Sequence, residues 1–319
     1  MADVARIVMH EGMARVVAFD LTADDEAVWG WGLGCNGAIE LFVEPAEKAA
    51  EVAGALRMAL EEERPISMVT VLDSSVPGVD QGNRLLVRPD GSAEVSLGDP
   101  ALDAAATASA LECLSRDRSE IRTLPGSSGE AKAFIEVLEP PLRLLVCGAG
   151  HDAAPLVRAA DGLGWRPIVV DDRSEFLNRD RFPEAAGFVQ LERPEDVAKI
   201  APIDERTFVV VMTHNFLRDK DYVRSLLGSP ARMIAMLGPG ARTERLLTEL
   251  REEGTAINGD DLARIHGPAG LDVGAEGPEE IAAAIVTEIV AVKRGREGGF
   301  LKHRLGPIHD RGTPARRSG

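Results

Sequence analysis

Short apolar runs alternate with helical patterns over residues 142–294, and this alternation constrains the fold more than any other feature of the chain. The runs are continuous rather than alternating with polar residues, as expected of strands covered on both faces. The expected strands are 142–147, 167–170, 187–191, 207–212 and 233–237, and the expected helices are 153–163, 194–200, 219–227, 242–253 and 278–293. Strands alternating with helices predict an α/β domain with a Rossmann-like, doubly wound parallel sheet.

A smaller α+β domain is expected over residues 1–124. Its expected strands are 14–21, 39–43, 66–72 and a hairpin around Asp90-Gly91, and its expected helices are 45–63 and 100–115. Residues 125–141 are interpreted as a linker and a connecting strand, because they begin with the loop-forming run PGSSG. Residues 295–319 are interpreted as a basic, flexible tail.

Charge and composition narrow the class of partner. The formal net charge is −16, although the segment from Lys293 onward carries about +6, so the chain is not expected to bind nucleic acid or an anionic membrane. No secretory signal pattern and no apolar run of membrane-spanning length occurs. The three cysteines (Cys35, Cys113 and Cys147) form no CxxC pair, which argues against a zinc site of that kind and against a disulfide scaffold. These features favour a cytoplasmic protein.

A glycine-rich loop falls between the first expected strand and helix of the second domain. Gly148 and Gly150, followed by His151 and Ala153, match G-x-G-x-x-G/A. Such a loop allows a phosphate to approach the backbone at a helix N-terminus. Asp171, at the end of the next strand, is placed to bind a ribose hydroxyl. A structural turn without a ligand is the alternative interpretation.

Three further loops follow strands on the same side of the predicted sheet, where open α/β sheets bind ligands. Each histidine could also be a hydrogen-bonded structural residue. The candidate contacts that we expect to converge with Gly148, Gly150 and Asp171 on one crevice are His151, Arg173, His214, Asn215, Arg242, His266 and Asp272. No nucleophile elbow or zinc-ligand spacing is present, so a catalytic residue and a metal site are not predicted.

Cys35 lies in a run of glycines, GLGCNG, that could present its thiol to a partner or a sulfur donor. A glycine turn with a buried cysteine is the simpler interpretation of composition alone.

Six blocks of sequence, taken in order, closely resemble the XdhC/CoxI family of xanthine dehydrogenase accessory proteins. They are GLGCNGAIELFVEP (32–45), LLVCGAGHDAAPL (144–156), VVDDR (169–173), VVMTHNFLRD (210–219), MLGPGARTERLL (236–247) and RIHGPAGLDVGAEGPEEIA (264–282). The ending GPIH (306–309) is also typical of the family.

The resemblance implies a maturation factor rather than a metabolic enzyme. Such a protein would bind and protect the molybdenum cofactor (molybdopterin), assist its sulfuration by a cysteine desulfurase, and deliver it to a xanthine-dehydrogenase-family apoenzyme. Cys35 matches the cysteine of the family's glycine-rich motif, which makes it a candidate sulfur or cofactor contact. Gly148, Gly150 and His151 match the family's Rossmann loop.

The family's N-terminal domain usually begins earlier and includes another glycine-rich block with its own cysteine. We therefore expect a truncated N-terminal domain that a small XdhC/CoxI partner could complete, or a homodimer formed through unpaired strands. Two other functions stay open from the residues themselves. One is an NAD(P)-dependent oxidoreductase that uses the Gly148 loop, and the other is an interaction scaffold that has no ligand.

Overall fold

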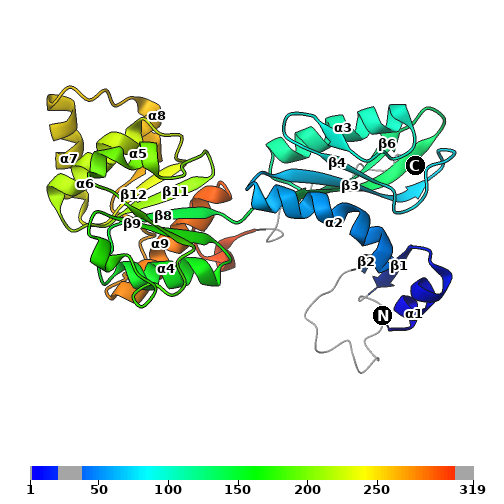
Figure 1. Ribbon diagram of the computed structural model, residues 1–319, viewed down its shortest axis with the longest axis horizontal. Coiled ribbons are helices and arrows are strands. Elements are labelled where there is room, and N and C mark those ends of the chain that lie inside the picture. The colour runs from blue at the N-terminus through cyan, green and yellow to red at the C-terminus, as the bar shows by residue number, and fades with distance from the viewer. Residues whose placement is uncertain (1, 21–37, 306–319) are drawn as a thin grey trace. The chain divides into compact units, whose positions relative to one another are not determined.

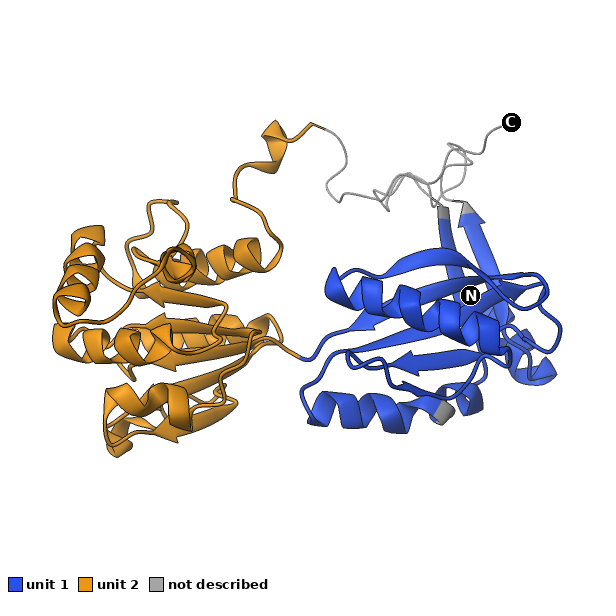
Figure 2. Cartoon of the chain, turned by 90° about the horizontal axis from the view of Figure 1, so that it is seen from above, with its two compact units in different colours: residues 1–140 blue, residues 141–319 orange. Residues whose placement is uncertain are grey.

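A computed structural model of the chain describes residues 2–20 and 38–305. The chain divides into two compact units, Met1–Pro140 and Pro141–Gly319 (Figure 2). None of the helices in the described ranges has both the length and the apolarity that crossing a bilayer requires. The fold class is as the sequence predicts: a Rossmann-like parallel sheet in the second unit and a smaller α+β arrangement in the first.

The first unit is built on a five-stranded antiparallel sheet of order β5-β4-β3-β7-β6, together with a separate antiparallel pair, β1 and β2. Its elements are α1 (Ala2–Glu11), β1 (Arg15–Asp20), β2 (Ala38–Val43), α2 (Ala46–Glu61), β3 (Ile66–Ser74), β4 (Arg84–Val87), β5 (Ala93–Glu94), α3 (Pro100–Ser115), β6 (Glu120–Pro125) and β7 (Glu130–Leu138). Figure 1 shows α3 lying along this sheet.

Helix α3 begins and packs as its sequence dictates. Asp99 caps the helix by accepting a hydrogen bond from Leu102 N, and Pro100 occupies the first turn, where no N–H is needed. Its buried residues recur at helical spacing and face the sheet: Leu102, Ala106, Ala110 and Cys113. Cys113 is therefore a small packing residue, as expected.

Residues 125–141, expected to form a linker and a connecting strand, contain a strand, but residues up to Pro140 belong to the first unit. Residues 126–129 form the turn between β6 and β7, and β7 is the strand that pairs with both β3 and β6. The sequence PGSSG marks a turn in either case, and only the pairing of β7 with β3 assigns it to the interior of the first unit. The boundary between the two units falls instead between Pro140 and Pro141 in the sequence.

The second unit has the doubly wound order β10-β9-β8-β11-β12-β13, with all neighbours parallel. Its elements are β8 (Arg143–Cys147), α4 (Ala153–Gly162), β9 (Arg166–Asp171), η1 (Ser174–Phe176), β10 (Gly187–Gln190), η2 (Pro194–Asp196), α5 (Val197–Ile200), β11 (Thr207–Val211), α6 (Phe216–Leu227), β12 (Met233–Met236), α7 (Gly240–Glu252), α8 (Gly259–Arg264), β13 (Ile265–His266), α9 (Pro278–Lys293) and η3 (Leu301–His303).

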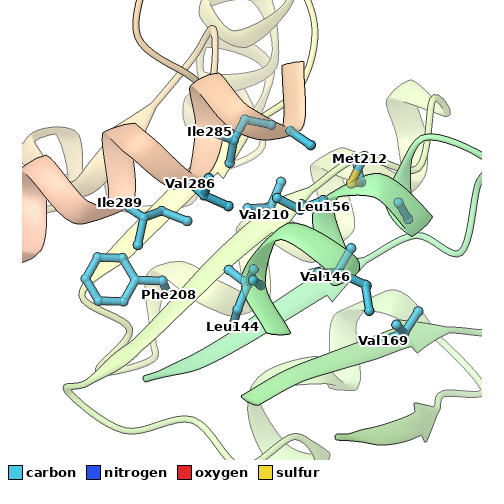
Figure 3. Close-up of a cluster of buried hydrophobic side chains, with 14 of the residues drawn as sticks. Leu144, Val146, Leu156, Val169, Phe208, Val210, Met212, Ile285, Val286 and Ile289 are labelled. Atoms are coloured by element: carbon cyan, nitrogen blue, oxygen red, sulfur yellow. The ribbon is translucent and has the colours of Figure 1, made fainter. Parts of the chain in front are cut away.

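The continuous apolar runs are explained by two cores, one on each face of this sheet. Leu144 and Val146 of β8 belong to the core with α4 and α9, whereas Leu145 and Cys147 belong to the core with α6 and α7. Figure 3 shows the first of these cores, in which Ile285 and Ile289 of α9 lie with strand residues and with α4. The inner strands β8, β9, β11 and β12 are thus covered on both faces, which is why their sequences are continuously apolar.

The strand order reverses between β8 and β11. The chain runs from β8 through β9 to β10 on one side and then returns to β11 on the other side of β8. Loops after β8 and β11 therefore diverge and open a crevice at the carboxyl edge of the sheet, which is where such folds bind ligands.

Candidate functional site

The loop after β8 adopts a conformation that requires glycine at its first position. Gly148 has φ of +117°, and a Cβ there would lie 2.7 Å from the carbonyl oxygen of Met212, the residue that follows β11. Gly150 has no unusual φ, and a Cβ at that residue would meet Asp152 Oδ1 at 2.8 Å. His151 is exposed on this loop.

Asp171 is buried beneath the same loop and is already fully engaged. Its Oδ2 accepts from Ala149 N at 2.7 Å and from Arg173 Nη2 at 2.8 Å, and its Oδ1 accepts from Arg173 N and Nε. Burial alone would raise the pKa of Asp171, but these hydrogen bonds outweigh it and hold the pKa well below its ordinary value. A ribose contact by Asp171 stays a prediction, and it would require the displacement of one of these partners.

Arg173 is held beside the loop by Asp171 and by an aromatic ring. Its guanidinium carbon lies 4.4 Å from the centre of the Phe176 ring. Arg181 lies over the same ring at 4.5 Å and donates to the carbonyl of Ala149 at 3.0 Å. Asp171, Arg173 and Arg181 thus form a network of hydrogen bonds and cation–π contacts that holds the glycine loop through Ala149.

A pocket of about 890 Å³ lies at the carboxyl edge of the sheet, on the side of β11, β12 and β13. Its charged and histidine side chains are Asp152, His214, Arg242, Asp272 and Glu276. The rest of its lining is mostly glycine, proline and small or apolar residues. Of the predicted contacts, the pocket brings together His214, Arg242 and Asp272.

His214 and Asp152 join the two loops that flank the reversal of strand order. His214 Nε2 lies 2.6 Å from Asp152 Oδ2. His214 has φ of +57°, a conformation that is costly for a residue other than glycine and that recurs at functional sites. Sequence reasoning included Asp152 in the glycine motif but did not identify it as a pocket residue, because its position beside His214 depends on the tertiary fold.

Arg242 is positioned by a buried carboxylate. Asp219 of α6, which is 1% exposed, accepts from Arg242 Nη2 at 2.6 Å and from the Thr213 hydroxyl at 2.5 Å. Phe216 lies beneath the guanidinium, 5.5 Å from its carbon to the ring centre. Arg242 nevertheless lines the pocket, so N–H groups that Asp219 does not engage can serve an anionic ligand.

His266 and Asn215 do not line the pocket and have structural partners. Asn215 caps α6 by accepting from Leu217 N and Arg218 N. His266 Nδ1 lies 2.9 Å from Glu288 Oε1, and Glu288 Oε2 accepts from Gly270 N at 2.7 Å. Glu288 of α9 therefore anchors the loop that forms one wall of the pocket. Sequence analysis did not identify Glu288, since an acidic residue on an amphipathic helix is usually solvated.

Cys35, the predicted sulfur or cofactor contact, lies outside the described residues. Cys113 and Cys147 are both buried, and burial raises the pKa of each thiol. Within residues 2–20 and 38–305, no group of three or more His, Cys, Asp or Glu side chains is arranged to hold a metal ion.

Comparisons with known proteins place both units. A family model described as the XdhC Rossmann domain matches residues 144–289, and one described as the XdhC and CoxI family matches residues 59–125. A Bacillus subtilis protein, described as a probable subunit of xanthine dehydrogenase, is 28% identical over 281 residues, covering 88% of this chain and 77% of the relative. Escherichia coli YqeB is 28% identical over 265 residues, covering 79% of this chain and 48% of YqeB.

A crystal structure of a Bacillus halodurans protein, described as a xanthine dehydrogenase, is similar over most of its length. It has a TM-score of 0.71 and 27% identity, and the match covers 92% of this chain and 80% of that one. The similarity therefore extends over both units of the chain.

Proposed function

Because the chain belongs to the XdhC and CoxI family, we propose that it is an accessory protein that holds the molybdenum cofactor for a xanthine-dehydrogenase-type apoenzyme. The observation that carries the proposal is the pocket beside Arg242, whose guanidinium is oriented in advance by a buried carboxylate. The relatives named for xanthine dehydrogenase support the choice of client enzyme.

The dimensions and walls of the pocket suit a rigid ligand built of fused rings. Its volume of about 890 Å³ is within the usual range for pockets that hold small molecules and cofactors. Walls made of Gly238, Pro239, Pro268, Ala269 and Gly270 leave room for a fused ring and expose peptide groups that can hydrogen-bond to its edges. Such walls also lose little side-chain entropy when a ligand binds.

The charges of the pocket suit the two ends of a phosphorylated pterin. Arg242 would bind the phosphate, because a guanidinium offers paired donors to phosphate oxygens. The carboxylates of Asp272 and Glu276 are available to accept from the amino and ring N–H groups of a pterin. When bound, the cofactor would supply a molybdenum centre for the client enzyme, and the residues named here would hold and shield it.

Assistance with sulfuration is part of the proposal, with a cysteine desulfurase as partner and Cys35 as the contact. Cys113 and Cys147 are 1% and 0% exposed, so both should react slowly with an alkylating reagent in the native protein. Rapid labelling would then report on Cys35, and slower labelling in the presence of cofactor would support its role. We also propose that the chain forms a homodimer or binds a small XdhC/CoxI partner.

The test is to purify the protein from cells that make molybdenum cofactor and to measure bound molybdenum, oxidised pterin and NAD(P). We expect pterin and molybdenum in the wild-type protein. For Arg242→Gln we expect a loss of about tenfold to a hundredfold in pterin affinity, because a hydrogen bond to a charged group contributes about 1.5–3 kcal/mol. Arg242→Lys keeps a charge beside Asp219 and should show an intermediate loss.

Arg245→Gln is the matched control. Arg245 lies on the same helix and over the same Phe216 ring, but its side chain is 72% exposed and does not line the pocket. Equal pterin content in the Arg242→Gln and Arg245→Gln proteins would contradict the role of Arg242, and a wild-type protein that retains no pterin would contradict the proposed function.

A further inference from the structure

The carboxylate of Asp152 lies at the place where a Rossmann loop normally faces a phosphate. Asp152 immediately precedes α4, and its Oδ1 lies within 2.8 Å of the position that a Cβ on Gly150 would take. In dinucleotide-binding folds, the second glycine of this motif leaves space for the pyrophosphate to approach the backbone. Here a negatively charged side chain lies against that glycine.

His214 holds Asp152 in this position. The carboxylate makes no capping hydrogen bond to the first turn of α4, and instead its Oδ2 lies 2.6 Å from His214 Nε2. The Asp152 side chain is only 20% exposed, so its charge is partly shielded from water. The helix dipole of α4 stabilises a negative charge at the N-terminus of the helix. Asp152 supplies that charge, so a phosphate is not needed there.

The other polar groups of the crevice also disfavour a phosphate beside the glycine loop. The Ala149 N–H, which could otherwise face a phosphate, donates to Asp171. Among the described side chains that line the pocket, Asp152, Asp272 and Glu276 are carboxylates, whereas Arg242 is the only arginine or lysine. The crevice can therefore offer an arginine to one phosphate group, but a second phosphate beside the glycine loop would face Asp152.

We propose that Asp152, held by His214, is a specificity-determining residue that excludes nucleotides with a pyrophosphate group, such as ADP and NAD+, from the crevice. The inference deepens the proposed function, and it rests on that function only for the identity of the ligand that is admitted.

The test is to compare Asp152→Asn with the wild-type protein, using ADP and NAD+ as probes. Asparagine has nearly the same shape and can still hydrogen-bond to His214, but it removes the charge. By isothermal titration at pH 8 and low ionic strength, we expect millimolar or weaker binding by the wild-type protein and at least tenfold tighter binding by Asp152→Asn. Raising the salt concentration should reduce this difference.

Asp161→Asn is the control, since Asp161 is an exposed residue near the far end of the same helix. It should bind both probes as weakly as the wild-type protein. His214→Ala, which frees the Asp152 side chain to move away, should give a smaller gain than Asp152→Asn. Micromolar binding of ADP or NAD+ by the wild-type protein, or no gain in Asp152→Asn, would overturn the inference. These assays contain no pterin, so their outcome is separate from that of the molybdenum and pterin measurements.

Discussion

Gly148 follows β8 with a positive φ, and a Cβ at this residue would lie only 2.7 Å from the carbonyl oxygen of Met212. Gly148→Ala should therefore destabilise the protein by about 1–3 kcal/mol, through backbone strain and a contact with a backbone atom that cannot rotate away. Gly162→Ala is the control, because Gly162 lies in α4 and a Cβ there would meet nothing within 4 Å. Urea unfolding should show a loss of stability for the first variant and none for the second.

Asp171 is the residue for which acid sensitivity is expected. Its pKa in the folded protein is lower than in the unfolded chain, where an aspartate titrates near pH 4, so its stabilising effect is present above about pH 4 and is lost as the pH falls below that value. Asp171→Asn should cost about 1–3 kcal/mol at pH 7, because Ala149 and Arg173 lose a charged acceptor. The difference between the variant and the wild-type protein should shrink between pH 4 and pH 2.5. A difference that stays constant with pH, in unfolding followed by circular dichroism, would show that Asp171 is not the group responsible.

At the scale of elements, α9 contacts both the core and the wall of the pocket. Its apolar side covers the sheet through Ile285 and Ile289, and its Glu288 side chain holds both His266 and the Gly270 amide of the pocket wall (Figure 3 shows the apolar side). The same helix therefore contributes to the stability of the core and to the shape of the pocket.

Glu288→Ala should loosen residues 267–271 while leaving α9 folded, since the apolar contacts remain. We expect faster hydrogen exchange in peptides that cover this loop and weaker pterin binding. Thr287→Ala is the neighbouring control, because the Thr287 hydroxyl bonds only to its own helix at Ala283 O. Unchanged exchange in Glu288→Ala would mean that the loop is held by other contacts.

At the scale of the whole molecule, the hydrophobic cores formed by residues 2–20 and 38–305 are separate in the two units, with two cores in each. Residues 141–319 should therefore fold and unfold cooperatively as an isolated fragment. For a fragment of the first unit, stability should depend on whether its C-terminal end includes β7, because β7 pairs with β3 along most of its length.

Fragments 1–140 and 1–124 provide the comparison. The longer fragment keeps β7 and should give a cooperative thermal transition. The shorter fragment lacks Ala131, Ala133 and Ile135 of the core and the strand that joins β6 to β3, so it should be unfolded. A folded 1–124 fragment would contradict the placement of β7 between β3 and β6.

The sequence by itself determined the features that depend on local periodicity. Continuous apolar runs placed β8, β11 and β12, and α3 and α9 begin and end at the predicted residues, because capping residues and apolar stripes act over a few residues. The glycine loop after β8 was also identified from its motif, and Gly148 has the positive φ that only glycine adopts without cost.

Only the tertiary structure decided how polar residues distant in sequence combine. Asp171 accepts a hydrogen bond from Ala149 of the glycine loop and does not line the pocket, Asp152 lies beside His214, and Asp219 orients Arg242. The same holds for β7, whose assignment to the first unit depends on pairing with β3 across more than 50 residues of chain. These partners follow from strand order and helix packing, which bring together side chains that no local pattern relates.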